Sequence, residues 1–136
     1  RTKKKIDKEK CKLNNLIKLL KPQGYFDYLK LQLNSKVVLS DSGTISEESS
    51  ILNFPAINIR EAHERPEAME EGSVMMSGLD YKRIKQCISI IENEKIMGIS
   101  PPKIVRDYSS QNVSQKVLRI IQSYTDYVNR KVWKKY

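Results

Sequence analysis

The residues best suited to do chemistry form the segment DSGTISEE, at positions 41–48. Ser42, Gly43 and Thr44 follow the apolar run VVLS at 37–40, and two carboxylates come within the next turn. If a helix begins here, its first backbone N–H groups lack partners and carry a partial positive charge, which suits a phosphate. The glycine would let an anion approach the backbone, and the two hydroxyls would add donors. Residues 42–44 are therefore a candidate phosphate cradle.

An ordinary helix start explains the same segment. Thr44 and Glu47 have the spacing of a capping box, in which each side chain binds the other residue's backbone N–H. Glu48 is harder to explain this way. Ile45, Glu48 and Leu52 fall on one helical stripe, and a carboxylate among apolar residues needs a partner. With Glu47 engaged in the cap, Glu48 can accept hydrogen bonds from the vicinal hydroxyls of a ribose, so the segment predicts a nucleotide diphosphate site.

The next polar segment is REAHERPEAMEEG, residues 60–72. Arg60 and Arg65 could neutralise a diphosphate, because a guanidinium pairs with phosphate oxygens bidentately. A solvated charged loop is the plainer interpretation, and His63 is expected to shape that loop rather than act as a base. As the single histidine, it also excludes a zinc site built from two or more histidines of this chain.

Short apolar runs alternate with helical patterns along the chain. The expected strands are 37–40, 55–59 and 73–76, and the expected helices are 25–34, 42–53, 80–96 and 113–133. The run LIKLL, at 16–20, fits either a strand or a helix, and prolines and glycine make 98–112 a loop. This alternation predicts an α/β fold with a parallel sheet flanked by helices. Such sheets bind ligands beyond the carboxyl ends of their strands, where the phosphate cradle lies.

Length and charge limit the other classes of function. The 136 residues fit one domain, and no apolar run approaches the roughly 20 residues of a membrane span. Much of the net charge of +9 lies in the terminal segments RTKKKIDKEK and RKVWKKY. A basic nucleic-acid-binding module is an alternative, but the middle of the chain is nearly balanced and lacks aromatic–basic interleaving, which argues against nucleic acid. The start without Met indicates a fragment or a processed chain.

The two cysteines, Cys11 and Cys87, are far apart in the sequence and have no metal-type spacing. We interpret them as free thiols in a reducing compartment, which predicts a cytoplasmic protein. Neither a metal nor a cofactor is expected.

The segments DSGTISEE and HERPEAMEEGSVMMSG together resemble the non-hydrolysing UDP-N-acetylglucosamine 2-epimerase family. Its pattern is DSGG-x-x-EE, followed after a helix and a strand by ERPE and a glycine. The likeness covers most of 20–97. It implies the type B glycosyltransferase (GT-B) fold, in which two Rossmann-like halves hold a UDP-sugar between them, with this chain as most of the C-terminal half. Residues 1–97 would then belong to the UDP-binding domain, and 98–136 to a loop and terminal helix that packs on the sheet or on the missing N-terminal domain.

The resemblance also implies which residues bind the UDP-sugar. They are Gln23 and Tyr28 on the uridine side, Ser42, Gly43 and Thr44 at the diphosphate, Glu48 at the ribose, and Arg65 of ERPE at the substrate. Thr44 departs from the family pattern, because it replaces the second glycine and would be strained if the turn needed a positive φ. The family's catalytic acids and bases lie in the N-terminal half, so none maps here. The chain alone should bind UDP weakly without turnover.

The implied activity is that of an isomerase, which eliminates UDP from the sugar and returns it after protonation of the opposite face of C2. AHERPEAMEEGSVMM and the tail SYTDYVNRKVWKKY look most like the capsule and O-antigen branch, which makes UDP-N-acetyl-L-fucosamine from UDP-2-acetamido-2,6-dideoxy-L-talose. Alternatives are a UDP-N-acetylglucosamine 2-epimerase making UDP-N-acetylmannosamine, and a GT-B glycosyltransferase. The parent enzyme is expected to be a homodimer.

Overall fold

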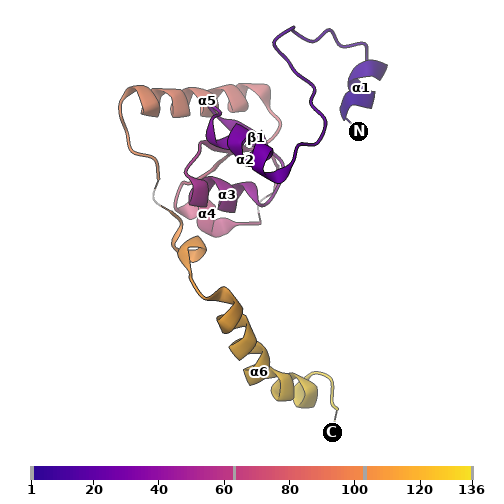
Figure 1. Ribbon diagram of the computed structural model, residues 1–136, viewed down its shortest axis with the longest axis vertical. Coiled ribbons are helices and arrows are strands. Elements are labelled where there is room, and N and C mark those ends of the chain that lie inside the picture. The colour runs from indigo at the N-terminus through magenta and orange to yellow at the C-terminus, as the bar shows by residue number, and fades with distance from the viewer. Residues whose placement is uncertain (1, 63, 103, 136) are drawn as a thin grey trace. The chain divides into compact units, whose positions relative to one another are not determined.

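The computed structural model describes residues 2–62, 64–102 and 104–135, so His63 and the role expected for it lie outside the described residues. In chain order the elements are α1 (Thr2–Lys8), α2 (Tyr25–Leu33), β1 (Val38–Ser40), α3 (Ile45–Leu52), β2 (Ala56–Asn58), α4 (Pro66–Glu70), β3 (Met75–Met76), α5 (Tyr81–Ile96), the 3-10 turn η1 (Arg106–Ser109) and α6 (Val113–Lys131) (Figure 1). The predicted strands and helices are confirmed, with strands one to two residues shorter than expected. The short helix α1 was not predicted.

The chain forms two compact units, residues 1–34 and 35–136. The first contains α1 and α2, joined by an exposed segment. The run at 16–20 forms neither a strand nor a helix, and Leu16 is 84% exposed. A short apolar run needs a neighbouring strand or an apolar surface to become regular, and spacing alone supplies neither. The division at residue 97 that the resemblance implies stays a prediction.

The second unit contains a parallel three-stranded sheet in the order β1-β2-β3. Val38 pairs with Ala56, and Ile57 pairs with Met75. All three residues of the central strand β2 are buried, as expected for a parallel strand covered on both faces. Both α3 and α5 contact β2. The predicted α/β architecture, a parallel sheet flanked by helices, is confirmed.

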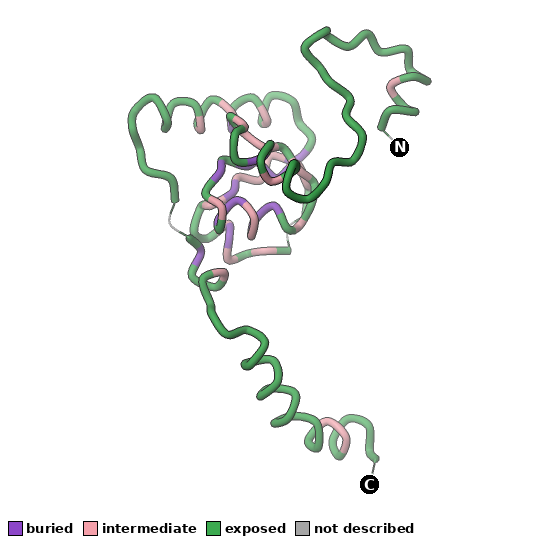
Figure 2. Tube along the Cα trace, in the orientation of Figure 1, coloured by how far each residue is buried: buried purple, intermediate pink, exposed green. Residues whose placement is uncertain are grey.

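The core of this unit lies between α3 and the sheet, where the buried residues gather in Figure 2. Ile45, Phe54, Ala56 and Val74 form it, with the first of these only 1% exposed. Ile45 is also the first residue of α3. Packing of this side chain therefore anchors the start of the helix, which four residues separate from the end of β1.

The loops that follow the strands lie at one edge of the sheet and contact one another. The backbone N–H of Leu79, after β3, donates to Glu61 Oε1, after β2, at 3.1 Å. Gly78, the residue before Leu79, adopts a positive φ of 63°. A Cβ at this position would lie 2.8 Å from Glu61 Oε1. The two loops thus share a tight contact that a glycine makes possible.

The segment after α5 is largely a loop, as predicted, and η1 forms within it. Val105 is 1% exposed, and its backbone N–H donates to Ser50 Oγ on α3 at 2.9 Å. This contact joins the segment before α6 to α3, the helix that follows the phosphate cradle. The amphipathic helix α6 itself has no buried residue among those described, as Figure 2 shows. Its apolar residues Val117 and Ile121 are exposed. No helix in the described part of the chain is long and apolar enough to cross a membrane.

The contact between Gly78 and Glu61 predicts that alanine destabilises two glycine positions to different extents. Gly72 and Gly78 both have a positive φ, near 64° and 63°, but a Cβ at Gly72 would meet nothing within 4 Å. Alanine at either position should lose roughly 1–2 kcal/mol of folding free energy because of its φ. Gly78→Ala should lose more, because Glu61 must move and release the Leu79 N–H. Urea unfolding of both variants measures this, and equal losses would contradict the proposed contact.

Candidate functional site

The turn between β1 and α3, residues 41–44 of the described part of the chain, contains no residue with a positive φ, and it ends in an ordinary right-handed conformation. Thr44 is the N-cap residue of α3, with φ −70° and ψ −11°, and its side chain makes no capping hydrogen bond. The predicted capping box is therefore wrong, and Glu47 contacts another residue instead. The strain expected for Thr44 is absent as well, because any L-residue adopts this φ.

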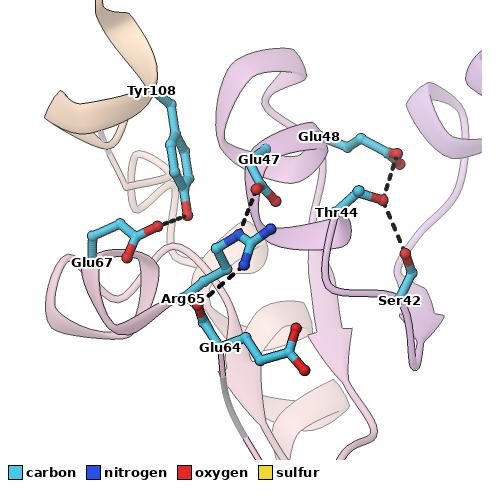
Figure 3. A network of polar contacts seen from close by, with 8 residues as sticks. All are labelled: Ser42, Thr44, Glu47, Glu48, Glu64, Arg65, Glu67 and Tyr108. Carbon is cyan, nitrogen blue, oxygen red and sulfur yellow. Dashed lines mark hydrogen bonds and ion pairs between the residues drawn. The ribbon is translucent and has the colours of Figure 1, made fainter. Parts of the chain in front are cut away.

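A line of three side chains crosses the turn (Figure 3). Thr44 Oγ1 donates to Glu48 Oε1 at 3.0 Å, and Ser42 Oγ lies 2.9 Å from Thr44 Oγ1. A carboxylate can only accept, so the single Thr44 proton points to Glu48 and Ser42 must donate to Thr44. The hydroxyls of Ser42 and Thr44, expected to bind phosphate, thus already form a hydrogen-bonded chain to Glu48, which is expected to bind the ribose.

The backbone N–H groups of the turn divide into two kinds. The Ser42 N–H donates to Ser40 Oγ at 3.1 Å, so it already has an acceptor inside the protein. The N–H groups of Gly43 and Thr44 donate to none of the residues described in the structure. They lie at the positive end of α3, where an anion is favoured. Of the three amides predicted to bind phosphate, these two are the available donors.

Gly43 faces the loop after β2. A Cβ at this glycine would lie 3.6 Å from Glu64 Oε2 and 3.8 Å from Arg60 Nη1, which are ordinary contact distances. Those two side chains form an ion pair at 2.8 Å. Hydrogen bonding to Arg60, together with its charge, lowers the pKa of Glu64 below its ordinary value. Neither the backbone conformation of Gly43 nor its neighbours require a glycine. The missing Cβ instead leaves room for a ligand to approach the backbone.

Arg65 lies at the start of α4, followed by Pro66 in the first turn as predicted. Its Nε donates to Glu47 Oε1 at 2.6 Å, and its Nη1 donates to the Glu64 carbonyl oxygen at 3.1 Å. The hydrogen bond to Glu47, with the charge of that carboxylate, raises the pKa of Arg65. In Figure 3 the guanidinium reaches from α4 to the first turn of α3. Arg65 is therefore bound to the first turn of α3, the helix that begins directly after the phosphate cradle.

Sequence reasoning missed two further members of this cluster. Tyr108, in η1, donates its hydroxyl to Glu67 Oε1 on α4 at 2.8 Å. Burial chiefly, and then the hydrogen bond to Glu67, raises the pKa of Tyr108, so the hydroxyl remains a donor at neutral pH. The two residues are 41 positions apart, and no local spacing indicates their contact.

Gln23 and Tyr28 belong to the first compact unit, which is described by itself. Gln23 Nε2 donates to the Lys21 carbonyl oxygen at 2.6 Å, and Tyr28 lies on α2. Their assignment to the uridine side of a ligand stays a prediction. Across the described ranges, no group of three or more His, Cys, Asp or Glu side chains could hold a metal ion.

Comparison with known proteins decides the family. The family model described as UDP-N-acetylglucosamine 2-epimerase matches residues 1–122 of this chain. The chain belongs to the UDP-N-acetylglucosamine 2-epimerase family. One relative of that name, from Methanococcus maripaludis, is 38% identical over 92 residues, which are 65% of this chain and 25% of the relative. The chain thus spans about a quarter of that protein's length.

Solved structures of epimerases agree with this assignment. The UDP-N-acetylglucosamine 2-epimerase from Rickettsia bellii is 47% identical, with a TM-score of 0.82 over 98% of this chain and 37% of that one. The Methanocaldococcus jannaschii epimerase, solved in complex with UDP-GlcNAc and UDP, is 31% identical, with a TM-score of 0.72 over 90% of this chain and 33% of that one. The epimerase likeness confirms the fold class, an α/β chain that forms part of the C-terminal half of a GT-B fold.

The ion pair beside Gly43 predicts how Glu64 titrates. Because Arg60 lowers its folded-state pKa, the pair should contribute stability above the unfolded-state pKa and lose it as the pH falls through the folded-state value. Carboxyl ¹³C NMR of Glu64 should show its pKa rising towards the ordinary value in Arg60→Ala. Identical titration curves in the two proteins would contradict the contact.

Proposed function

We propose that this chain is the UDP-binding part of a UDP-sugar 2-epimerase, an isomerase that inverts C2 of a UDP-2-acetamido sugar by eliminating UDP and adding it back. The observation that carries the proposal is the pair of N–H groups at Gly43 and Thr44, which lie at the start of α3 beside the hydrogen-bonded line ending at Glu48. The M. jannaschii relative, solved with UDP-GlcNAc and UDP, supports the choice of ligand.

Each part of the site has a role in this proposal. The diphosphate accepts hydrogen bonds from the phosphate cradle, chiefly from the amides of Gly43 and Thr44. Glu48 accepts from the ribose hydroxyls, and it can keep its bond to Thr44 because a carboxylate offers about four acceptor positions. Arg65 contributes positive charge, and Gln23 and Tyr28 hold the uridine.

The Arg60–Glu64 pair must rearrange for a diphosphate to reach Gly43. Glu64 Oε2 stands 3.6 Å from the position of a Cβ on that glycine, and its charge would repel the ligand. The Glu64 side chain is 58% exposed, so it can turn into solvent at low cost. Arg60 would then exchange a carboxylate for a phosphate as its partner.

The chemistry of the sugar is assigned to the amino-terminal part that longer relatives carry. We propose that this part supplies the acids and bases, that the parent enzyme is a homodimer, and that the 136-residue chain alone does not turn over. The free thiols Cys11 and Cys87 fit a cytoplasmic protein. A role in capsule or O-antigen precursor synthesis, with UDP-2-acetamido-2,6-dideoxy-L-talose as the substrate, is the finer proposal. The solved relatives named as UDP-N-acetylglucosamine 2-epimerases make UDP-GlcNAc the competing substrate.

A fusion of this chain to the amino-terminal part of the R. bellii relative provides the material for testing, and is called the fusion protein below. Incubation with UDP-GlcNAc, the substrate named for the enzyme that donates the amino-terminal part, followed by product analysis at C2, tests whether this chain supports epimerisation. Epimerisation without an acceptor sugar is expected. Transfer of the sugar to an acceptor would instead indicate a glycosyltransferase, and binding of RNA that falls steeply with salt and survives loss of Glu48 would indicate a basic nucleic-acid module.

Two variants test the diphosphate and ribose contacts separately. Gly43→Ala fits the unliganded turn without a clash, so it should leave thermal unfolding unchanged while weakening UDP and sparing uridine, which has no diphosphate. Glu48→Ala should weaken both ligands, by roughly 1–3 kcal/mol for a lost charged contact, and should abolish any preference for UDP over 2′-deoxy-UDP. Calorimetry on the fusion protein measures these affinities. Unchanged UDP affinity in both variants would refute the proposal.

A further inference from the structure

We infer that Glu47 is a positioning residue, which holds the Arg65 guanidinium in place for the diphosphate, and that Glu47 and Glu48 therefore have separate tasks. The inference rests on the proposed function, because it requires that Arg65 meets the ligand. It replaces the capping role that the sequence predicted for Glu47 with a role at the binding site.

The contact between the two residues is short and partly shielded from water. Arg65 Nε and Glu47 Oε1 are 2.6 Å apart, and their side chains are 34% and 29% exposed. A charge-assisted hydrogen bond of this kind is stronger than a neutral one and fixes direction as well as distance. The two residues are 18 positions apart, on α3 and at the start of α4, so the bond ties together the segments that follow two adjacent strands.

The carboxylate of Glu47 is committed to this partner. Its other oxygen, Oε2, is buried and accepts no hydrogen bond from the residues described. A buried carboxylate oxygen is costly, and the positive charge of Arg65 is what offsets that cost here. The guanidinium in turn has its Nε turned towards α3 and its Nη1 anchored on the Glu64 carbonyl oxygen. Both ends of the pair are thereby held in one arrangement.

A second layer supports the same arrangement from the other side. Tyr108 holds Glu67 by a hydrogen bond of 2.8 Å, and the charge of Glu67 acts on Arg65. Val105, three residues before Tyr108, is buried and donates its backbone N–H to Ser50 Oγ of α3, which holds this segment close to the helix. Figure 3 shows Tyr108 and Glu67 on one side of the guanidinium and Glu47 above it. An arginine that served only as a surface charge would not need two carboxylates and a partly buried tyrosine around it.

The competing explanation is a structural staple, in which the ion pair joins α3 to α4 and the ligand never meets Arg65. The two explanations predict different effects of a substitution at Glu47. A staple affects the free energy of unfolding, whereas a positioning residue affects UDP affinity and acts through Arg65.

The test compares Glu47→Gln, Arg65→Ala and the double variant in the fusion protein. Glu47→Gln keeps the shape of the side chain and removes its charge, so UDP should bind about tenfold more weakly, the effect of losing about one charged hydrogen bond. KM should rise by a similar factor while kcat changes little. The double variant should bind UDP no more weakly than Arg65→Ala alone, because Glu47 acts only through Arg65. Glu71→Gln, an exposed glutamate at the end of α4, is the matched control and should bind UDP as the unmodified fusion protein does.

Each outcome distinguishes the inference from the proposed function. If Arg65→Ala weakens UDP but Glu47→Gln does not, or if the two effects add, the positioning role is overturned and the proposed function stands. If Arg65→Ala itself leaves UDP affinity unchanged, both the ligand role of Arg65 and the positioning role of Glu47 are overturned. Should Glu47→Gln not fold, Glu47→Asp takes its place, since it keeps the charge and loses the reach. The inference then requires that Glu47→Asp weakens UDP binding when Arg65 is present. Glu47→Asp should cause no further weakening when Arg65 is already replaced by alanine.

Discussion

The burial of Ile45 at the first residue of α3 is the constraint on which the candidate site depends. Because this side chain packs in the core with Phe54, Ala56 and Val74, it anchors the start of α3, which four residues separate from the carboxyl end of β1. The first N–H groups of α3 are therefore held in a fixed direction at the edge of the sheet. A parallel sheet covered on both faces makes that edge the natural place for a ligand. The chemistry of the phosphate cradle thus follows from the packing of an apolar residue next to it.

Adjacent carboxylates on one helical turn acquire different environments because successive helical residues point in directions about 100° apart. Glu48 turns towards the cradle and accepts a hydrogen bond from the Thr44 hydroxyl, whereas Glu47 turns towards α4 and accepts one from Arg65 Nε. The same helix thus contacts both the loop that begins it and the loop that follows the next strand. Tyr108 extends this arrangement to the segment leading into α6. The site is built from three separate stretches of the sequence that meet at α3.

The sequence predicted the parts of the structure that depend on local patterning. Parallel strands, the helices α3 and α5, the loop position of the cradle and Pro66 at the start of α4 all follow from apolar periodicity and turn residues. The interactions of Glu47 could not be predicted, because the local capping rule competes with a partner 18 residues away, and the distant partner carries a full charge. Tyr108 gave no signal, since its contact depends on Val105 being buried. The run at 16–20 was expected to form a strand or a helix and forms neither. Apolar composition alone does not produce a regular element where no surface is present to pack against.

The most direct measurement of the central claim is amide NMR of the fusion protein during titration with UDP. If the N–H groups of Gly43 and Thr44 bind the diphosphate, their amide protons should shift downfield and exchange more slowly with UDP, and should respond little to uridine. The Ser42 amide should change less, because it already donates to Ser40 Oγ. UDP binding that leaves the amides of Gly43 and Thr44 unchanged, with shifts confined to other parts of the chain, would contradict the account.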